Sequence, residues 1–479
     1  MLQNPSNART PLNPGDSVTL RLDSLAAGGE AVGRHEGLAV FVEYGAPGDL
    51  AQVRITQRAS SYARGTIETL VEPGPGRIEA PCPYFPACGG CQWQHLDYPA
   101  QVSAKEQILA ESFARIGGLQ PQATGPAVAM AHPFDAKEQT PWRYRGAAEY
   151  SVAATSQEAD SPALGFLRGR SSEVIAIADC LVQHPLNVEV LRATNDWLAR
   201  RGADELWLVR ARASFAEQRA LVTLVFRKDD ASAEELAQHL LRAVPGVAGV
   251  SGLAARDRRD QHRRLSSHLA GEEFIFEEIA GRRYRISADT FFQVNPQQAA
   301  HLVELVRRMA RLGPEEIVVD AYCGAGIFLL PLAEQAGEAI GIESNPAAAR
   351  DARANLRRAG LKNALVMRDK VERALPMLAR SQARRRNAAA QRGAPPRHSP
   401  GSRADVVVLD PPRQGCGRQV INAVVTLEPR AVIMVSCDPA TLARDAALLA
   451  EHGYAPRRSV LVDLFPHSWR IESVILCER

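Results

Sequence analysis

The chain has 479 residues, of which 46% are hydrophobic and 23% charged, and its 57 basic and 54 acidic residues leave a formal net charge of +3. This composition excludes a fibrous or disordered chain and a histone-like polycation, and the length suits two or three domains. No apolar run reaches the roughly 18–20 residues of a membrane helix, and the polar, proline-rich start lacks a signal-peptide core. We therefore expect a soluble, cytoplasmic monomer that makes no membrane contact.

The N-terminal part predicts a small β-barrel. Residues 1–14 are polar and proline-rich, and we expect a flexible tail there. Residues 15–75 hold short β-type runs separated by Gly, Pro and Asp turns at about ten-residue spacing, which is typical of an OB-like barrel. Such barrels often bind oligonucleotides, but a purely structural barrel fits the same pattern.

The rest of the chain predicts a multi-domain α/β protein. Residues 76–285 contain a Pro/Gly-rich loop, a helix at 99–118 and then alternating strands and helices, which indicates an α+β central domain. Residues 286–479 repeat a strand, glycine turn and helix, which predicts a Rossmann-like parallel sheet covered by helices on both faces. A basic stretch within it, 381–403, has no acidic residue and no apolar periodicity, and we expect a disordered surface insertion.

Three cysteines cluster in the Pro/Gly-rich loop, as Cys82, Cys88 and Cys91. In a reducing compartment such a cluster indicates a metal site or catalysis rather than cross-links. Zinc sites usually pair one Cys-x2-Cys with a second such pair, and no second pair follows. Five residues separate Cys82 from Cys88, whereas radical S-adenosylmethionine enzymes use the motif Cys-x3-Cys-x2-Cys. Three unligated, exposed thiols remain the structural alternative.

A glycine loop, Asp-Ala-Tyr-Cys-Gly-Ala-Gly at 320–326, follows one predicted strand and opens a helix. Its glycines permit a sharp turn close to a ligand, and the helix N-terminus offers free N–H groups. Leu329 stands where a dinucleotide fingerprint has its third glycine. Glu343 ends the next strand, where a carboxylate can accept hydrogen bonds from both hydroxyls of the ribose of a nucleoside ligand. Asp369 follows the next apolar run, where it is placed to meet the amino group of an adenine. The arrangement looks like the S-adenosylmethionine (SAM) pocket of class I methyltransferases.

Residues with ionisable side chains also lie at the ends of the later predicted strands. Asp410 ends the strand VVVLD, where doubly wound sheets keep their active sites. Cys437 lies beyond the corresponding end of VIMVS; because the apolar positions stop at Val435, we expect its thiol to face the crevice. A small buried core cysteine is the alternative. Glu472 precedes the last strand.

Together, the ordered motifs DAYCGAG, FFQVN, LDPPRQG, VSCDPATLARD and DLFPHS…IES resemble the RNA uracil-C5-methyltransferase family through most of the chain. The resemblance implies that Cys437 is the nucleophile that adds to C6 of uracil and that Glu472 is the base that removes the C5 proton. One departure is Trp469-Arg470, where the family pattern has a small polar residue and a histidine. The residues that the resemblance places around SAM and the uracil are Gln293, Tyr322, Gly324, Gly326, Ile327, Glu343, Asp369, Lys370 and Asp410.

The same resemblance suggests a branch of the family. The rRNA branch carries this cysteine loop and closes a 4Fe–4S cluster with one distant cysteine, which nominates Cys180 here. Residues 15–75 look like its TRAM domain, an RNA-binding barrel. We therefore expect a SAM-dependent enzyme that makes 5-methyluridine in a loop or bulge of 23S rRNA. The alternatives are uracil methylation in tRNA and a non-catalytic, cluster-bearing RNA-binding protein. Arg143, Arg145 and the run 256–264 are candidates for phosphate contacts, with a solvated face as the alternative.

Overall fold

The structure, a computed structural model, describes residues 12–131, 140–153, 162–203, 205–228, 230, 232–261, 264–391 and 404–479. The chain divides into two compact units. The first runs to Ile108 and also includes Phe465–Arg470, and the second comprises Leu109–Leu464 and Ile471–Arg479. A short segment near the C-terminus therefore belongs with the N-terminal part of the chain.

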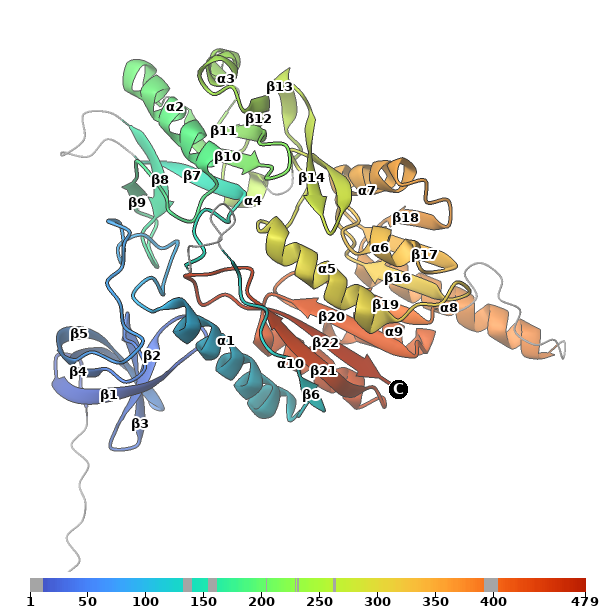
Figure 1. The fold of residues 1–479 in the computed structure, drawn as a ribbon, viewed down its shortest axis with the longest axis horizontal. Coiled ribbons are helices and arrows are strands. Elements are labelled where there is room, and N and C mark those ends of the chain that lie inside the picture. Colours follow the sequence, from blue (N-terminus) through green and yellow to red (C-terminus); the bar gives the residue numbers. More distant parts are fainter. Residues whose placement is uncertain are drawn as a thin grey trace, which may run out of the picture. The chain divides into compact units, whose positions relative to one another are not determined.

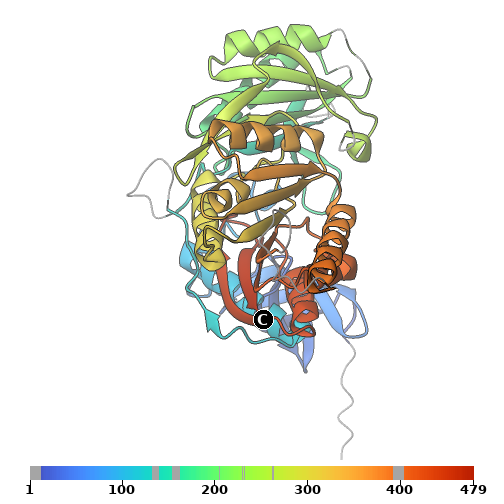
Figure 2. The same ribbon diagram turned by 90° about the vertical axis from the view of Figure 1, so that its right-hand side faces the viewer.

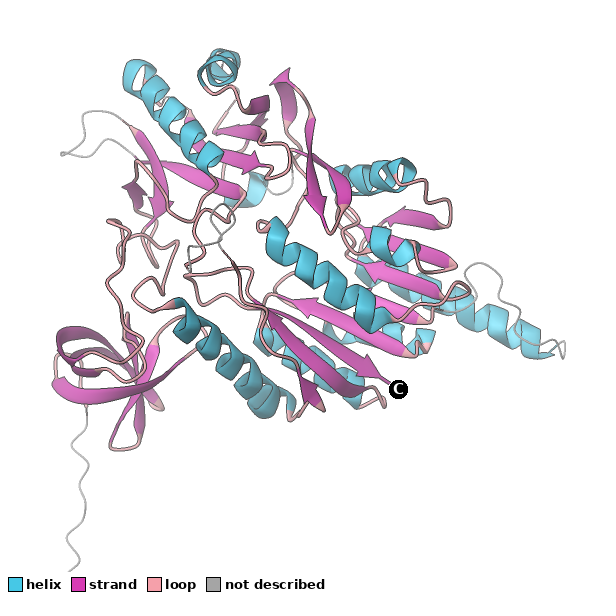
Figure 3. Ribbon diagram, in the orientation of Figure 1, coloured by secondary structure: helices cyan, strands magenta, loops and turns pink. Residues whose placement is uncertain are grey.

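The first unit begins with a closed barrel of five strands in the order β1-β2-β3-β5-β4, drawn in magenta in Figure 3. Alternate residues face its interior, including the buried Leu20, Leu22, Val53 and Ile55, as the period of two requires. Leu12 is also buried, so the end of the expected tail belongs to the barrel; residues 1–11 lie outside the described residues. The strands are β1 (Ser17–Leu25), β2 (Ala31–His35), β3 (Leu38–Glu43), β4 (Leu50–Arg58) and β5 (Tyr62–Glu72), and helix α1 (Tyr98–Ser112) follows.

The second unit contains a seven-stranded mixed sheet in the order β13-β12-β11-β10-β7-β8-β9 (Figure 1). One of its inner strands, Ala220–Phe226, is buried along its whole length. The elements are β7 (Ala147–Ala153), β8 (Ala163–Leu167), β9 (Val174–Ala176), α2 (Pro185–Arg201), β10 (Leu206–Ala213), β11 (Ala220–Phe226), α3 (Ser232–Ala243), β12 (Val247–Ala254), α4 (Arg258–Gln261) and β13 (Ser267–Gly271), followed by the hairpin β14 (Phe274–Ile279) and β15 (Arg282–Ser287).

An eight-stranded sheet in the order β18-β17-β16-β19-β20-β22-β21-β6 completes the second unit. Strands β18 to β20 are parallel, whereas β22 runs antiparallel to both of its neighbours. The carboxyl ends of the parallel strands therefore share one edge. The strands are β6 (Ala123–Thr124), β16 (Ile317–Ala321), β17 (Glu338–Glu343), β18 (Ala364–Arg368), β19 (Val406–Leu409), β20 (Ala431–Ser436), β21 (Ala455–Val462) and β22 (Glu472–Glu478).

Helices lie on both faces of this sheet, as predicted; Figure 2 shows α5 on one side and α8 on the other. Asn and Asp side chains cap several of them, and Asp438, for example, accepts from the N–H groups of Ala440 and Thr441. Among the described residues no helix is both long and apolar enough to cross a membrane. The helices are α5 (Pro296–Ala310), α6 (Leu329–Ala333), α7 (Pro346–Arg358), α8 (Val371–Gln391), α9 (Gly417–Leu427) and α10 (Pro439–Ala450).

The predicted disorder of 381–403 is wrong for its first half. Helix α8 continues to Gln391, and residues 392–403 lie outside the described residues. The stretch to Gln391 is rich in Ala and Arg, which have among the highest helix propensities. Such a stretch can extend an existing helix without an apolar face.

Candidate active site and cofactor loop

The glycine loop and Glu343 meet at the carboxyl ends of β16 and β17. The Gly324 N–H donates to Glu343 Oε2 at 2.9 Å, and the Asn345 N–H donates to Oε1 at 2.6 Å. Gly324 and Gly326 have φ angles of 54° and 89°, which favour glycine. A Cβ placed on Gly324 would meet no atom within 4 Å, so the loop borders open space. A carboxylate with free lone pairs beside an open glycine loop fits a ribose.

The other predicted cofactor residues differ in their contacts and in their exposure to solvent. Tyr322 has φ 68°, and its hydroxyl donates to Glu372 Oε1 of α8 at 3.0 Å. Asp369 follows β18 and forms an ion pair with Arg373 at 3.0 Å. The Asp369 side chain is partly exposed. Of the rest, Ile327 is buried, Gln293 and Asp410 are partly exposed, and Lys370 is exposed.

The predicted nucleophile and base are neighbours because their strands pair. Ser436, the last residue of β20, pairs with Ser473 of β22 in antiparallel register. Cys437 is the next residue along one strand, and Glu472 is the residue opposite along the other. Cys437 is partly exposed, whereas Glu472 is buried.

Four groups interact electrostatically at this edge of the sheet, and one of them, Arg413, was not predicted. Burial, followed by the Glu472 carboxylate, raises the pKa of the Cys437 thiol to about 11. Burial and the nearby Asp410 raise the pKa of Glu472 well above its usual value, and burial raises that of Asp410 to about 7. Arg413 opposes the increase at both Cys437 and Glu472. It is the one basic residue in the motif LDPPRQG, and this position in the motif is the sequence feature that could have identified it.

The loop that carries Arg413 is held by α10. The Arg413 carbonyl accepts from Thr441 Oγ1 at 3.2 Å, and the Gln414 carbonyl accepts from Arg444 Nη2 at 2.9 Å. The Cys416 N–H donates to the buried Asp445 at 2.6 Å. The residues of VSCDPATLARD that follow Cys437 therefore position the loop, a role that sequence reasoning did not assign.

The three clustered cysteines lie in a loop without helix or strand. Cys82, Cys88 and Cys91 are partly exposed and form no disulfide. Burial raises the pKa of the Cys88 thiol, and neighbouring Cys82 raises it further. Within the described ranges, no three Cys, His, Asp or Glu side chains converge as ligands of one metal ion. A 4Fe–4S cluster has a different requirement, since each of its four irons takes one thiolate.

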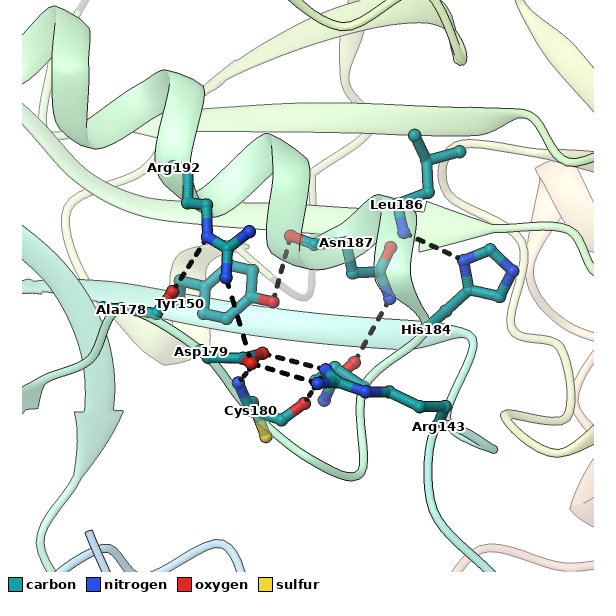
Figure 4. A network of polar contacts seen from close by, with 10 residues as sticks. Arg143, Tyr150, Ala178, Asp179, Cys180, His184, Leu186, Asn187 and Arg192 are labelled. Carbon is teal, nitrogen blue, oxygen red and sulfur yellow. Dashed lines mark hydrogen bonds and ion pairs between the residues drawn. The ribbon is translucent and has the colours of Figure 1, made fainter. Parts of the chain in front are cut away.

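The segment with Cys180 is anchored by Arg143, which corrects the expectation that Arg143 contacts phosphates or lies on a solvated face. Its Nη1 donates to Asp179 Oδ1 at 2.8 Å and to the Cys180 carbonyl at 2.7 Å (Figure 4). Its Nη2 donates to the other Asp179 oxygen at 3.0 Å. The Cys180 N–H donates to Asp179 at 2.6 Å. The guanidinium is therefore committed to fixing the backbone of Cys180.

The chain is similar to known proteins over most of its length. Residues 214–479 match the family model of tRNA (uracil-5-)-methyltransferases, and residues 11–67 match the TRAM domain. An uncharacterised RNA methyltransferase of Halalkalibacterium halodurans is 32% identical over 99% of this chain and 99% of its own. Another, from Thermosynechococcus vestitus, is 34% identical over 96% of this chain and 98% of its own.

A solved structure shares the fold along the whole chain. It is the Pyrococcus abyssi tRNA (uracil-54, C5)-methyltransferase in complex with S-adenosyl-L-homocysteine. It is 20% identical, with a TM-score of 0.67 over 96% of this chain and 100% of that one. The chain therefore belongs to the RNA (uracil-5-)-methyltransferase family: it is a SAM-dependent enzyme that methylates uracil in RNA, and it carries an N-terminal TRAM domain.

Proposed function

We propose that this enzyme makes 5-methyluridine in 23S rRNA, with Cys437 as the nucleophile and Glu472 as the base. The observation that carries the chemical roles is the β20–β22 register, which makes the thiol and the carboxylate neighbours. The choice of 23S rRNA is supported by the combination of a TRAM barrel with the Cys82–Cys91 loop in one chain. The target uridine must leave its stack to reach a partly buried thiol, which favours a loop or bulge.

Uracil C5 is too weak a nucleophile to take a methyl group unaided. Bound SAM supplies a methyl group on a positively charged sulfur. The Cys437 thiolate adds to C6, and the ring electrons then make C5 nucleophilic enough to take that methyl group. The Glu472 carboxylate next removes the C5 proton, the C5–C6 double bond re-forms, and the C6–S bond breaks to release Cys437. Proton removal by a placed carboxylate contributes about 10²–10⁴-fold.

Both groups must be deprotonated to act, and their surroundings disfavour this in the free enzyme. The thiol pKa of about 11 leaves little thiolate at neutral pH. The carboxyls of Glu472 and Asp410, whose pKa values are both raised, also favour retention of a proton between them. We propose that Arg413, which lowers the pKa of both Cys437 and Glu472, stabilises their charged forms during the reaction.

We further propose that Cys82, Cys88, Cys91 and Cys180 hold a 4Fe–4S cluster that braces an RNA-binding surface. Four thiols suit such a cluster, and the Arg143 clamp on Cys180 is consistent with a ligand that must not move. Anaerobically purified protein should contain about four irons per chain and show the visible absorbance of an iron–sulfur cluster. Serine at any of the four positions should remove this absorbance, whereas Cys477→Ala, in buried strand β22, should not. Equal iron in all variants would contradict the assignment.

Methylation of tRNA is the second candidate. The P. abyssi tRNA (uracil-54, C5)-methyltransferase shares its fold with 96% of this chain, so the fold alone does not separate the two substrates. Methyl-labelled SAM should be incubated separately with unmodified 23S rRNA and unmodified tRNA. Label recovered as 5-methyluridine from rRNA supports the proposal. Label only in tRNA would replace it with the second candidate, and label in neither, despite SAM binding, would contradict both.

A further inference from the structure

The segment Phe465–Arg470, here called the strap, joins β21 to Ile471 and the base Glu472, yet it is packed in the first unit. Its third residue, His467, is buried and has φ 64°, a left-handed conformation that is uncommon for a residue with a side chain. Such a conformation persists only where surrounding contacts determine it. The contacts that determine it come from two elements of the first unit.

The first of these elements is helix α1. Gln101 Oε1 accepts from the His467 N–H at 2.7 Å, and Gln101 Nε2 lies 3.3 Å from His467 Nδ1. One turn further along the helix, Lys105 Nζ donates to the Phe465 carbonyl at 2.9 Å. Both side chains are completely buried. Burying a lysine is costly unless it is hydrogen-bonded, so the bond to the Phe465 carbonyl offsets part of the cost of burying Lys105.

The second element is the segment that directly follows the cysteine loop. The N–H groups of Gln92 and Trp93 both donate to the His467 carbonyl at 3.0 Å. The Trp93 indole donates to the Gly29 carbonyl of the barrel at 3.0 Å. Trp469 lies so close to Gly29 that a Cβ there would stand 3.1 Å from its ring. Trp469, which departs from the family pattern, therefore packs within the first unit.

We infer that Gln92, Trp93, Gln101 and Lys105 form a seat whose purpose is to position Glu472. A single residue, Ile471, separates the strap from Glu472, the first residue of β22, so a change in the conformation of the strap is passed to Glu472 through one residue. The four residues are positioning residues, because they act through the strap and not on the uracil. This inference rests on the proposed role of Glu472 as the base. It connects the cysteine loop to one chemical step, the removal of the C5 proton.

The inference predicts a defect in one step of the reaction. Lys105→Met keeps the length and apolar stem of the side chain but removes the donor to Phe465. Attack by Cys437 should be unchanged, while release of the methylated RNA should slow about tenfold or more, as expected when a catalytic group is displaced by about 1 Å. Lys228→Met is the matched control, since Lys228 lies on the surface and pairs with Glu205.

The two steps can be measured separately with in vitro transcripts of 23S rRNA, or of tRNA if only tRNA accepts label. A 5-fluorouridine transcript reports attack and methyl transfer without the release step, because its C5 carries no proton to remove and the methylated covalent adduct accumulates. An ordinary transcript reports release, through adduct on a denaturing gel and the rate of 5-methyluridine formation. Normal adduct formation with fluorinated RNA and adduct accumulation with ordinary RNA would support the seat. Equal loss of both steps, or normal release, would overturn it.

Glu472→Gln must be measured in parallel. If it traps no adduct on ordinary RNA, the proposed role of Glu472 is wrong; if it traps adduct and Lys105→Met does not, only the seat is wrong. Should Lys105→Met fail to fold, His467→Gly decides, because glycine adopts the φ of 64° freely and loosens the strap without removing its backbone bonds. Adduct accumulation in that variant supports the seat, and a normal release rate overturns it.

Discussion

Ser436 and Ser473 pair across β20 and β22, and Ser473 Oγ donates to the Ser436 carbonyl at 3.4 Å. This pair marks the edge where regular pairing of the two strands ends. Immediately beyond it, Cys437 and Glu472 are brought together although 34 residues separate them in sequence. A slip of one residue in this register would turn every side chain of β22 to the other face. The geometry of the two catalytic candidates therefore depends on the pairing of two strands.

We predict opposite effects from two substitutions at this edge. Cys437→Ala should form no covalent RNA adduct and no product while still binding SAM, because the attacking thiol is absent. Glu472→Gln should form the adduct and retain it, with turnover lowered by about 10²–10⁴-fold. A denaturing gel with labelled RNA distinguishes these outcomes. Glu451→Gln, at the exposed end of α10, is the control and should turn over normally.

The rate of adduct formation should increase with pH between about 7 and 9. The pKa of Cys437 is raised to about 11, so the thiolate fraction grows throughout this range. Arg413→Gln removes a positive charge that lowers this pKa, and the rate at a fixed pH should fall about tenfold for each unit of further increase. The measurement is a pH–rate profile with 5-fluorouridine RNA. Arg418→Gln, on α9, is the control; identical profiles for the Arg413 and Arg418 variants would argue against the role of Arg413.

Glu343→Gln should weaken SAM binding without unfolding the protein. The amide would place an NH2 group against the Gly324 or Asn345 N–H, and it would lose the charge that strengthens bonds to ribose hydroxyls. A hydrogen bond to a charged group is worth about 1.5–3 kcal/mol, so affinity should fall about 10–100-fold. Titration calorimetry measures this directly. Glu338→Gln, at the other end of β17, should bind SAM normally.

Asp49→Asn should destabilise the barrel. Burial alone would raise the pKa of Asp49, but the Arg77 guanidinium and the N–H groups of Gly74 and Ala46 outweigh burial and hold the pKa below its usual value. Breaking a buried ion pair costs about 3–5 kcal/mol. We expect about 2–3 kcal/mol here at pH 7, since Arg77 stays partly exposed.

The same pair gives a pH dependence with a defined sign. Because the folded-state pKa is depressed, the stabilisation is present above about pH 4 and is lost as pH falls through the folded-state pKa. Thermal unfolding at pH 7 and at pH 3 should therefore differ less in Asp49→Asn than in the unsubstituted protein. Asp23→Asn, exposed on β1 of the same barrel, should behave like the unsubstituted protein.

The sequence by itself determined the features that depend on local order along the chain. The alternation of β19 and β20 with helices predicts a parallel sheet, and strand-end positions predict that Glu343, Asp410 and Cys437 lie along one edge of it. Local sequence features also led to one wrong prediction. A composition without apolar periodicity was interpreted as disorder, although Ala and Arg extend helix α8 to Gln391.

Only the tertiary structure decided which distant residues meet. Strand pairing sets Cys437 against Glu472, and the loop held by α10 brings Arg413 to them. Arg143 proved to be the anchor of Cys180, and the strap leading to Glu472 proved to be bound by α1 and the segment after the cysteine loop. Many of these contacts are made by backbone carbonyls, which find donors wherever the folded chain supplies them. Such contacts leave no periodic signal in the sequence.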